Sequence, residues 1–178
     1  MDKNLEKRMY FLTLYNISDI QKGIQCGHAQ NEYALNYWND EEFQDWAKNW
    51  KTWIILNGGT SNDASKSFYG AEKELGSMEK HLSILMENID KFTVFYEPDL
   101  NNALTSIAFL VDERVFNKKD YPDFINYMFE IKQVNNLDLD VSEGYEDRYP
   151  KEYQEWVDFV GGKQNVFLRE FLQQFRLA

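Results

Sequence analysis

Four polar side chains share one row of a predicted helix. At 100° per residue, the segment 20–38 places Gln21, Gln25, His28 and Glu32 together, beside an apolar stripe. That stripe is made of Ile24, Gly27, Ala34, Leu35 and Trp38. Amides donate and accept hydrogen bonds, and a histidine serves either as a general base or as a structural side chain at the edge of a core. The row predicts a binding or catalytic surface, and both interpretations of His28 stay open.

Three other patterns are better explained by structure than by chemistry. Cys26 is the one cysteine of the chain, and a lone thiol on a helix is more often packed than nucleophilic. Gly58 and Gly59 follow a predicted strand, but no phosphate-binding motif continues from them, so we expect a turn. The acidic segment 135–147 departs from the register of a calcium loop, so we expect a solvated loop. The spacing of His, Cys and carboxylate residues predicts no metal site and no cofactor.

Composition limits the partners that the chain can bind. Its 43% hydrophobic content predicts a folded protein. The formal charge of −11 argues against a broad nucleic-acid surface, because binding to the phosphate backbone depends on Lys and Arg. The same charge fits a small-molecule ligand or a basic protein partner. The single cysteine and the lack of a signal-like or membrane-spanning segment predict a cytoplasmic protein. The richness in Asn, Tyr, Phe, Lys and Ile hints at an AT-rich, virus-like origin, which would place it in the host cytoplasm.

The order of the predicted elements indicates an α/β fold. Apolar and β-branched runs predict four strands, at 9–15, 52–56, 92–96 and 105–111. Helical periodicity predicts helices at 20–38, 40–48 and 63–91. We therefore expect residues 1–112 to form a small mixed four-stranded sheet with helices on its faces. Residues 113–178 are predicted to be a helical extension packed on it, with helices near 121–131, 150–160 and 165–176.

The segment Gln25-Cys26-Gly27-His28-Ala29, on the first helix after the first strand, resembles the signature of the type-2 peptidyl-tRNA hydrolase family. The resemblance covers roughly residues 8–112 and implies that family's small mixed sheet. It also implies hydrolysis of the ester that joins a peptide to the tRNA 3′ ribose, without a metal. Three features depart from the family pattern. Gln21 stands where the family has a Lys, with Lys22 one place later, and the loop after the third strand is short. The chain is also strongly acidic, whereas the family's substrate is a tRNA.

The resemblance assigns roles to particular residues. His28 or Asp99 would position or deprotonate a water molecule. Lys22 would stabilise the developing oxyanion, and Thr105 would hold the substrate. The ligand-binding rim would add further amide side chains, namely Gln21, Gln25, Asn101 and Asn102.

Two alternatives to the enzyme remain open. In the first, the same rim binds or sequesters a nucleotide or nucleotide-derived signal without cleaving it, as a virus-encoded counter-defence protein would. In the second, the acidic surface and the aromatic helices of 113–178 bind a basic protein partner or a second copy of the chain. The partners expected are thus tRNA, a small nucleotide or a protein, and not a membrane.

Overall fold

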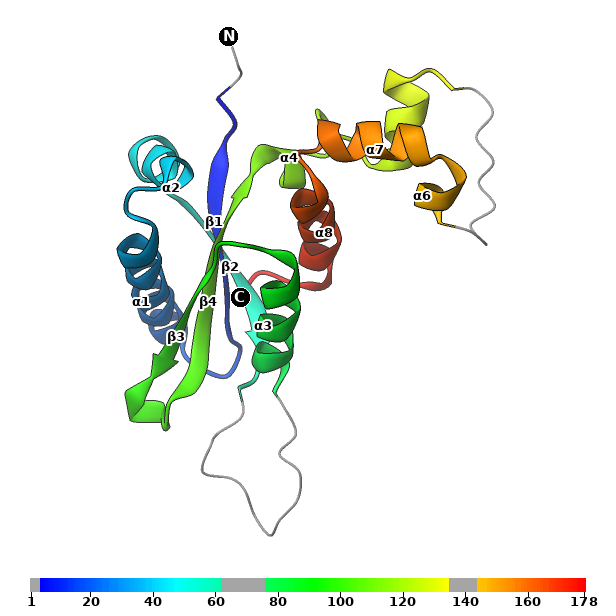
Figure 1. Cartoon of the computed structure of the whole chain (residues 1–178). Coiled ribbons are helices and arrows are strands. Elements are labelled where there is room, and N and C mark those ends of the chain that lie inside the picture. The colour runs from blue at the N-terminus through cyan, green and yellow to red at the C-terminus, as the bar shows by residue number, and fades with distance from the viewer. Residues whose placement is uncertain (1–3, 62–75, 135–143) are drawn as a thin grey trace. The chain divides into compact units, whose positions relative to one another are not determined.

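The computed structural model describes residues 4–61, 76–134 and 144–178 (Figure 1). The chain forms two compact units. Unit 1 consists of Met1–Val111 together with Gln174–Ala178, and unit 2 consists of Asp112–Gln173. Within the described ranges, no helix is long and apolar enough to cross a membrane.

Unit 1 is built on a mixed sheet with the strand order β2-β1-β4-β3 (Figure 1). The strands are β1 (Lys7–Leu14), β2 (Thr52–Gly59), β3 (Thr93–Glu97) and β4 (Ala103–Asp112). β1 and β2 pair in parallel, with Arg8 opposite Thr52, whereas β3 and β4 pair antiparallel. Residues 9–14 and 103–109 are all buried, because the two central strands are covered on both faces. The predicted α/β fold with a mixed four-stranded sheet and helices is confirmed.

Helices cover both faces of this sheet. They are α1 (Asp19–Tyr37), α2 (Glu41–Asp45) and α3 (Ser77–Asn88). α1 lies against one face and α3 against the opposite face (Figure 1). Side chains alternate along β1, so Met9 and Phe11 pack in the cluster that includes α1. Leu12 points the other way and lies with Met78 of α3 beside Gly58.

The first two helices of unit 1 begin and end close to the predicted positions. Ser18 caps α1 through a reciprocal capping box with Gln21, which fixes its first turn. The short helix predicted at 40–48 is α2 followed by a π-helical turn, which ends at Lys51 in the left-handed conformation. The helix predicted at 63–91 corresponds to α3, and residues 63–75 of that prediction lie outside the described residues.

The predicted buried face of α1 is wrong. Ile24, Leu35 and Trp38 are 49%, 77% and 64% exposed, and α1 turns the opposite side to the sheet. The buried residues of the helix are Gln25, Cys26, Ala29 and Tyr33. The small side chains of this face let α1 approach the sheet closely, and the ring of Tyr33 packs 5.7 Å from Phe43. The apolar pattern marked the side of Ile24, Leu35 and Trp38, whereas packing against the sheet selected the side of Cys26, Ala29 and Tyr33.

The last residues of the chain extend the sheet edge of unit 1. The amide of Asn57 donates to the carbonyl of Arg176, and the amide of Ala178 donates to the carbonyl of Ile55. Leu177 forms an isolated antiparallel bridge with Leu56 of β2. The helix predicted at 165–176 is therefore too long, because its final residues pair with an edge strand that would otherwise expose unpaired backbone groups.

Unit 2 is helical. Its main helices are α7 (Pro150–Phe159) and α8 (Lys163–Phe171), with short helices α4 (Glu113–Phe116), α5 (Phe124–Asn126) and α6 (Tyr145–Arg148). A π-helical turn, Tyr127–Ile131, continues α5. The core is a cluster of buried side chains, namely Phe124, Tyr127, Met128, Trp156, Val157 and Val160. The prediction of a loop at 135–147 is wrong at its end, because α6 begins at Tyr145. Residues 135–143 of that prediction lie outside the described residues.

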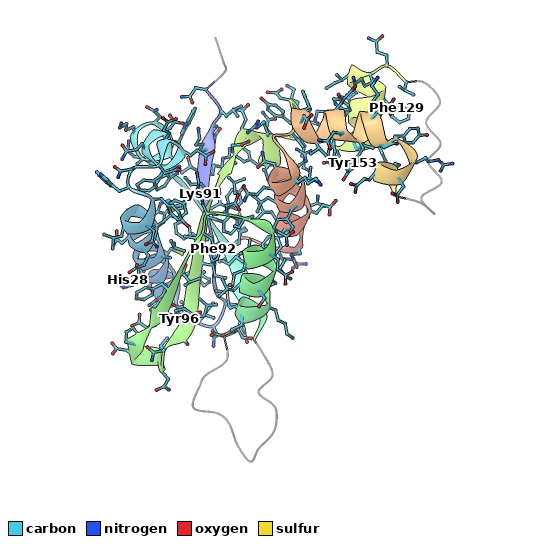
Figure 2. All side chains as sticks on the ribbon, in the orientation of Figure 1. His28, Lys91, Phe92, Tyr96, Phe129 and Tyr153 are labelled. Atoms are coloured by element: carbon cyan, nitrogen blue, oxygen red, sulfur yellow. The ribbon has the colours of Figure 1, made fainter. Side chains whose placement is uncertain are left out.

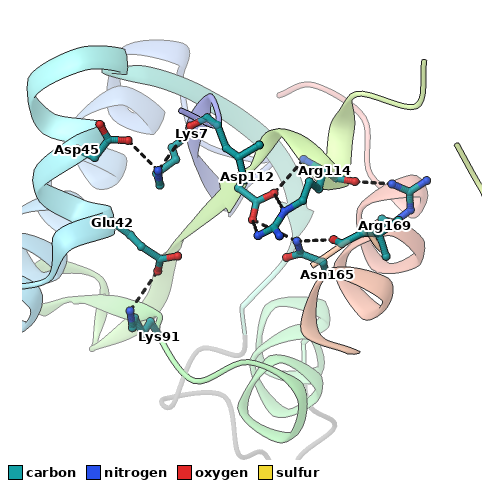
Figure 3. A network of polar contacts seen from close by, with 10 residues as sticks. Lys7, Glu42, Asp45, Lys91, Asp112, Arg114, Asn165 and Arg169 are labelled. Atoms are coloured by element: carbon teal, nitrogen blue, oxygen red, sulfur yellow. Dashed lines mark hydrogen bonds and ion pairs between the residues drawn. The ribbon is translucent and has the colours of Figure 1, made fainter. Parts of the chain in front are cut away.

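A buried arginine joins the elements of unit 2 (Figure 3). Arg169 of α8 donates to the carbonyl oxygens of Arg114 and Tyr121 and to the carboxylate of Asp123. Gly161 has a positive φ of 95°, and a Cβ there would lie 2.4 Å from the guanidinium carbon of Arg114. Glycine at this position therefore allows α7 and α8 to connect tightly.

Candidate functional site

The candidate site lies at the end of the sheet where β1 and β2 finish and α1 begins. The amide of Tyr15, just after β1, donates to the carbonyl of Gly59 at the end of β2. The turn between β3 and β4 comes to the same end, because Gln25 of α1 bonds both Glu97 and Thr105. In α/β sheets, ligands bind beyond the carboxyl ends of the parallel strands. In this sheet that is the end where α1 begins.

Gln25 is the centre of this site. Its Nε2 donates to Oε2 of Glu97 at 2.6 Å, and its Oε1 accepts from the hydroxyl of Thr105 at 2.6 Å. The orientation of the amide is fixed by these neighbours, since only its nitrogen can donate to a carboxylate. Gln25 and Thr105 are buried, and Glu97 is partly buried. The structure thus brings together two predicted site residues, Gln25 and Thr105. It adds the carboxylate of Glu97, which was not predicted from the sequence.

A β-bulge places Thr105 beside Gln25. Phe95 pairs with Ser106 and Tyr96 pairs with Leu104, so Thr105 is the extra residue in β4. Thr105 and Ser106 are consecutive, yet both turn toward α1, where Ser106 lies 3.9 Å from the sulfur of Cys26. A regular strand would send one of them to the opposite face.

His28 lies one turn after Gln25 and is exposed. Its ring stacks on Phe95 of β3, with 4.5 Å between the centroids and 25° between the planes. Figure 2 labels His28 on α1 and Tyr96 on β3. Phe95 and Glu97 are two residues apart on the strand, so both face α1. That spacing is the signal by which Glu97 could have been found in the sequence.

Lys22 and Gln21 differ in their surroundings. The Lys22 side chain is 14% exposed and shares the buried side of α1 with Gln25. Its ammonium group lies 3.2 Å from Asp19, whose side chain is 97% exposed, so solvent weakens this ion pair. Gln21 is exposed, and its side-chain oxygen accepts from the amide of Ser18 in the helix cap. The structure brings Lys22 toward the site and gives Gln21 a capping role.

Asp99, Asn101 and Asn102 lie on the turn between β3 and β4. Asp99 is in a single 3₁₀ turn, Pro98–Leu100, and is exposed. Asn101 and Asn102 have positive φ angles of 55° and 56°, a conformation that Asn tolerates. The amide of Asn102 donates to the carbonyl of Glu97, which closes the turn. These three residues lie on the turn that follows Glu97, and the carboxylate that reaches Gln25 is that of Glu97.

The site contains no activated thiol. Cys26 is fully buried, and burial raises its thiol pKa to about 11. It is therefore a packed residue, as expected. Residues 4–61, 76–134 and 144–178 contain no group of three or more His, Cys, Asp or Glu side chains that could hold a metal ion.

A separate cleft of about 280 Å³ lies on the α3 side of unit 1. It is lined by Gly58, Gly59, Ser77, His81 and Arg176, among others. Gly59 has a φ of 92°, and a Cβ there would lie 1.9 Å from the hydroxyl of Ser77. The Ser77 hydroxyl already accepts from the amide of Thr60. The glycine pair therefore serves the tight connection between β2 and α3.

Comparisons of the chain with models of protein families, with curated proteins and with solved structures found no match.

Proposed function

We propose that unit 1 hydrolyses the ester between a peptide and the ribose of a tRNA 3′ end, as the resemblance to type-2 peptidyl-tRNA hydrolases implies. One observation supports this proposal most. Lys22, Gln25 and His28 follow one another along α1 at the end of the sheet where Glu97 and Thr105 bond Gln25. A cation, a hydrogen-bonded amide and an imidazole are thus available beside one surface.

The chemistry assigned to these groups is general base catalysis. His28 takes a proton from water, and the resulting hydroxide attacks the ester carbonyl carbon. Lys22 stabilises the negative charge that develops on the carbonyl oxygen. The bond to the ribose oxygen then breaks, and that oxygen recovers the proton from His28. Lys22 and His28 are six residues apart, so they are separated by about 9 Å along the helix axis and by about 120° around it, on either side of Gln25.

Gln25, Thr105 and Glu97 have a positioning role in this proposal. The Thr105 hydroxyl and the Glu97 carboxylate hold the Gln25 amide in one orientation. Their hydrogen bonds make the surface rigid, so the substrate does not have to order it. The net charge of −11 opposes a long contact with the RNA backbone, so we propose that contact is limited to the acylated 3′ end.

The test is a peptidyl-tRNA hydrolysis assay with matched variants. His28→Ala should lower kcat by about 100-fold or more, the usual contribution of a general base. His81→Ala changes the other histidine, on α3, and should leave the rate unchanged. Cleavage that is unaffected by His28→Ala, or an inactive wild-type protein, would refute the proposal.

A second candidate function is nucleotide binding without cleavage. The observation that favours it is that both ends of the Gln25 amide are already bonded within the protein, which is typical of a rigid rim. Calorimetric titration with adenosine monophosphate and with a cyclic dinucleotide tests it. Binding that is lost in His28→Ala, together with an absence of hydrolysis, would favour this function over the first.

A further inference from the structure

Unit 2 contains a cavity of about 600 Å³, within the range of roughly 300–1,000 Å³ usual for ligand pockets. Its walls include four aromatic side chains, those of Phe124, Tyr145, Tyr153 and Trp156. The centroid of the Phe124 ring lies 5.3 Å from Tyr145, 5.4 Å from Tyr153 and 5.8 Å from Trp156. The ring planes are inclined by 45°, 63° and 69°, so their faces turn in different directions.

The four rings differ in exposure. Phe124 and Trp156 are buried, and the indole N–H of Trp156 donates to the carbonyl of Pro122 at 3.0 Å. Tyr145 and Tyr153 are half-buried, and Figure 2 labels Tyr153 on α7. The buried rings form the floor of the cavity and the tyrosines form walls that reach the solvent.

One wall of the cavity already carries a cation. The guanidinium carbon of Arg169 lies 5.9 Å from the centroid of the Trp156 ring, within the range of a cation–π interaction. Its charge is compensated by Asp123, 2.6 Å away, which also pairs with Lys118. The aromatic wall is thus compatible with a cationic group next to a carboxylate.

Two further carboxylates line the cavity. Glu146 of α6 and Glu170 of α8 are exposed, and in the part of the chain that the structure describes neither forms an ion pair. The pKa of the Tyr153 hydroxyl is raised by burial and then by the charges of Glu146 and Glu170. Both carboxylates therefore act on the same aromatic wall, and they make it attractive to cations and repulsive to phosphates.

We propose that this cavity binds a lysine or arginine side chain presented by a basic segment of a protein partner. The methylene groups of such a side chain lie on the rings of Tyr145 and Tyr153, and its charged end meets Glu146 and Glu170. The occupant is cationic because the carboxylates of Glu146 and Glu170 border the aromatic walls, and it is a protein side chain because its methylene stem packs on the aromatic rings. This interaction site is independent of the hydrolase proposed for unit 1.

Calorimetric titration with short peptides tests the proposal in the full-length protein. The probes are an eight-residue peptide of alternating arginine and glycine, the same peptide with lysine, and the same peptide with neutral citrulline. The titrations are made at about 150 mM salt, where the Debye length of about 8 Å screens distant surface charges. The arginine and lysine peptides should bind and the citrulline peptide should bind at least tenfold more weakly.

Matched variants separate the cavity from the overall acidity of the protein. Glu146→Gln with Glu170→Gln removes both of these carboxylates and should weaken binding about tenfold. Glu130→Gln with Glu152→Gln removes the same charge from residues of unit 2 that do not line the cavity, and should change affinity less than twofold. All four residues lie at or near the protein surface, so both double variants should fold. Equal weakening by the two pairs would overturn the proposal.

The aromatic walls are tested separately. Tyr153→Leu keeps an apolar side chain but removes a ring face, and should weaken binding about fivefold, which is within the usual range of a cation–π interaction. Circular dichroism confirms that the variant is folded. Wild-type protein that binds none of the peptides at millimolar concentration, or that binds citrulline as well as arginine, would also overturn the proposal.

Discussion

Unit 1 and unit 2 each bury a polar side chain that joins several elements, but the two side chains differ in charge. In unit 1 the neutral amide of Gln25 is bonded by Thr105 and Glu97. In unit 2 the charged guanidinium of Arg169 is bonded by Asp123 and by two carbonyl oxygens. When a buried neutral group loses its hydrogen-bond partner, the loss of folding free energy is the desolvation of one dipole. When a buried charged group loses its partners, the loss of folding free energy is larger. Arg169 should therefore dominate the stability of its unit, whereas Gln25 can be altered at a smaller cost in folding free energy.

The largest effect is expected at Arg169. Arg169→Met keeps an unbranched stem but removes every donor to Asp123, Arg114 and Tyr121. The free energy of unfolding should fall by about 3–5 kcal/mol, because hydrogen bonds to a charged group contribute about 1.5–3 kcal/mol each and three of them are lost. Urea denaturation measures this loss. Lys163→Met, at an exposed position of the same helix, is the control and should change stability by less than about 0.5 kcal/mol. A loss below about 1 kcal/mol for Arg169→Met would remove the contrast between the two units.

A smaller loss is expected at Thr105. Thr105→Val keeps the shape of the side chain but removes the hydroxyl that bonds Gln25, so the buried amide oxygen loses its donor. Stability should fall by about 1–3 kcal/mol. Thr105→Ser retains the hydroxyl and should retain the hydrogen bond.

A double-mutant cycle sharpens this prediction. Gln25→Met with Thr105→Val removes both partners, so it should destabilise the protein by less than the sum of the single changes. Strict additivity would show that the two side chains are not coupled, in contradiction to their 2.6 Å hydrogen bond.

The features that the sequence predicted well are those set by local pattern. The strands follow continuous apolar runs such as 9–14, and α1 begins at the capping box of Ser18, a local signal. The buried face of α1 was not predictable in the same way. Apolar residues occur on both sides of that helix, and the side with Cys26 and Ala29 is chosen by tertiary packing against the sheet.

The candidate site was also predictable only in part. Gln25 and Thr105 stand out in the sequence, but their contact depends on a β-bulge that no local pattern marks. Glu97 was missed because an acidic residue at the end of a strand is usually solvated. The cavity of unit 2 combines residues from α5, α6, α7 and α8, so it depends on long-range packing that periodicity does not reveal.

Each unit also contains a carboxylate whose pKa is lowered by its contacts, so the pH dependence of stability tests those contacts. In unit 1, the hydrogen bond from Lys7 and those from Asn49 and Trp50 lower the pKa of Asp45 to about 2 (Figure 3). Because the folded-state pKa is below the unfolded value of about 3.9, this stabilisation is present above pH 4 and is lost as the pH falls toward 2. In unit 2, Arg114 and Asn165 lower the pKa of Asp112 in the same direction, against the effect of burial.

Asp45→Asn should therefore reduce stability by about 1 kcal/mol at pH 7, where solvent screening limits the contribution of this partly exposed group. The difference from the wild type should shrink between pH 4 and pH 2. Denaturation curves measured at both ends of that range test it. A difference that stays constant would mean that Lys7 and Asp45 are not paired in solution.

The smallest effect on stability, and the sharpest separation of structure from function, is expected at Lys22. Its ion pair with Asp19 is solvent-exposed on the acidic side and contributes little, but its stem is largely buried, so Lys22→Ala should lower the free energy of unfolding by less than about 1 kcal/mol. The proposed oxyanion role predicts a much larger effect on hydrolysis, of about 100-fold in kcat. Asp19→Asn breaks the same ion pair but keeps the ammonium group, so it should leave the rate within about twofold of the wild type. Equal rates for wild type and Lys22→Ala would remove Lys22 from the site, whereas a large loss of stability would make it a structural residue, like Arg169 of unit 2.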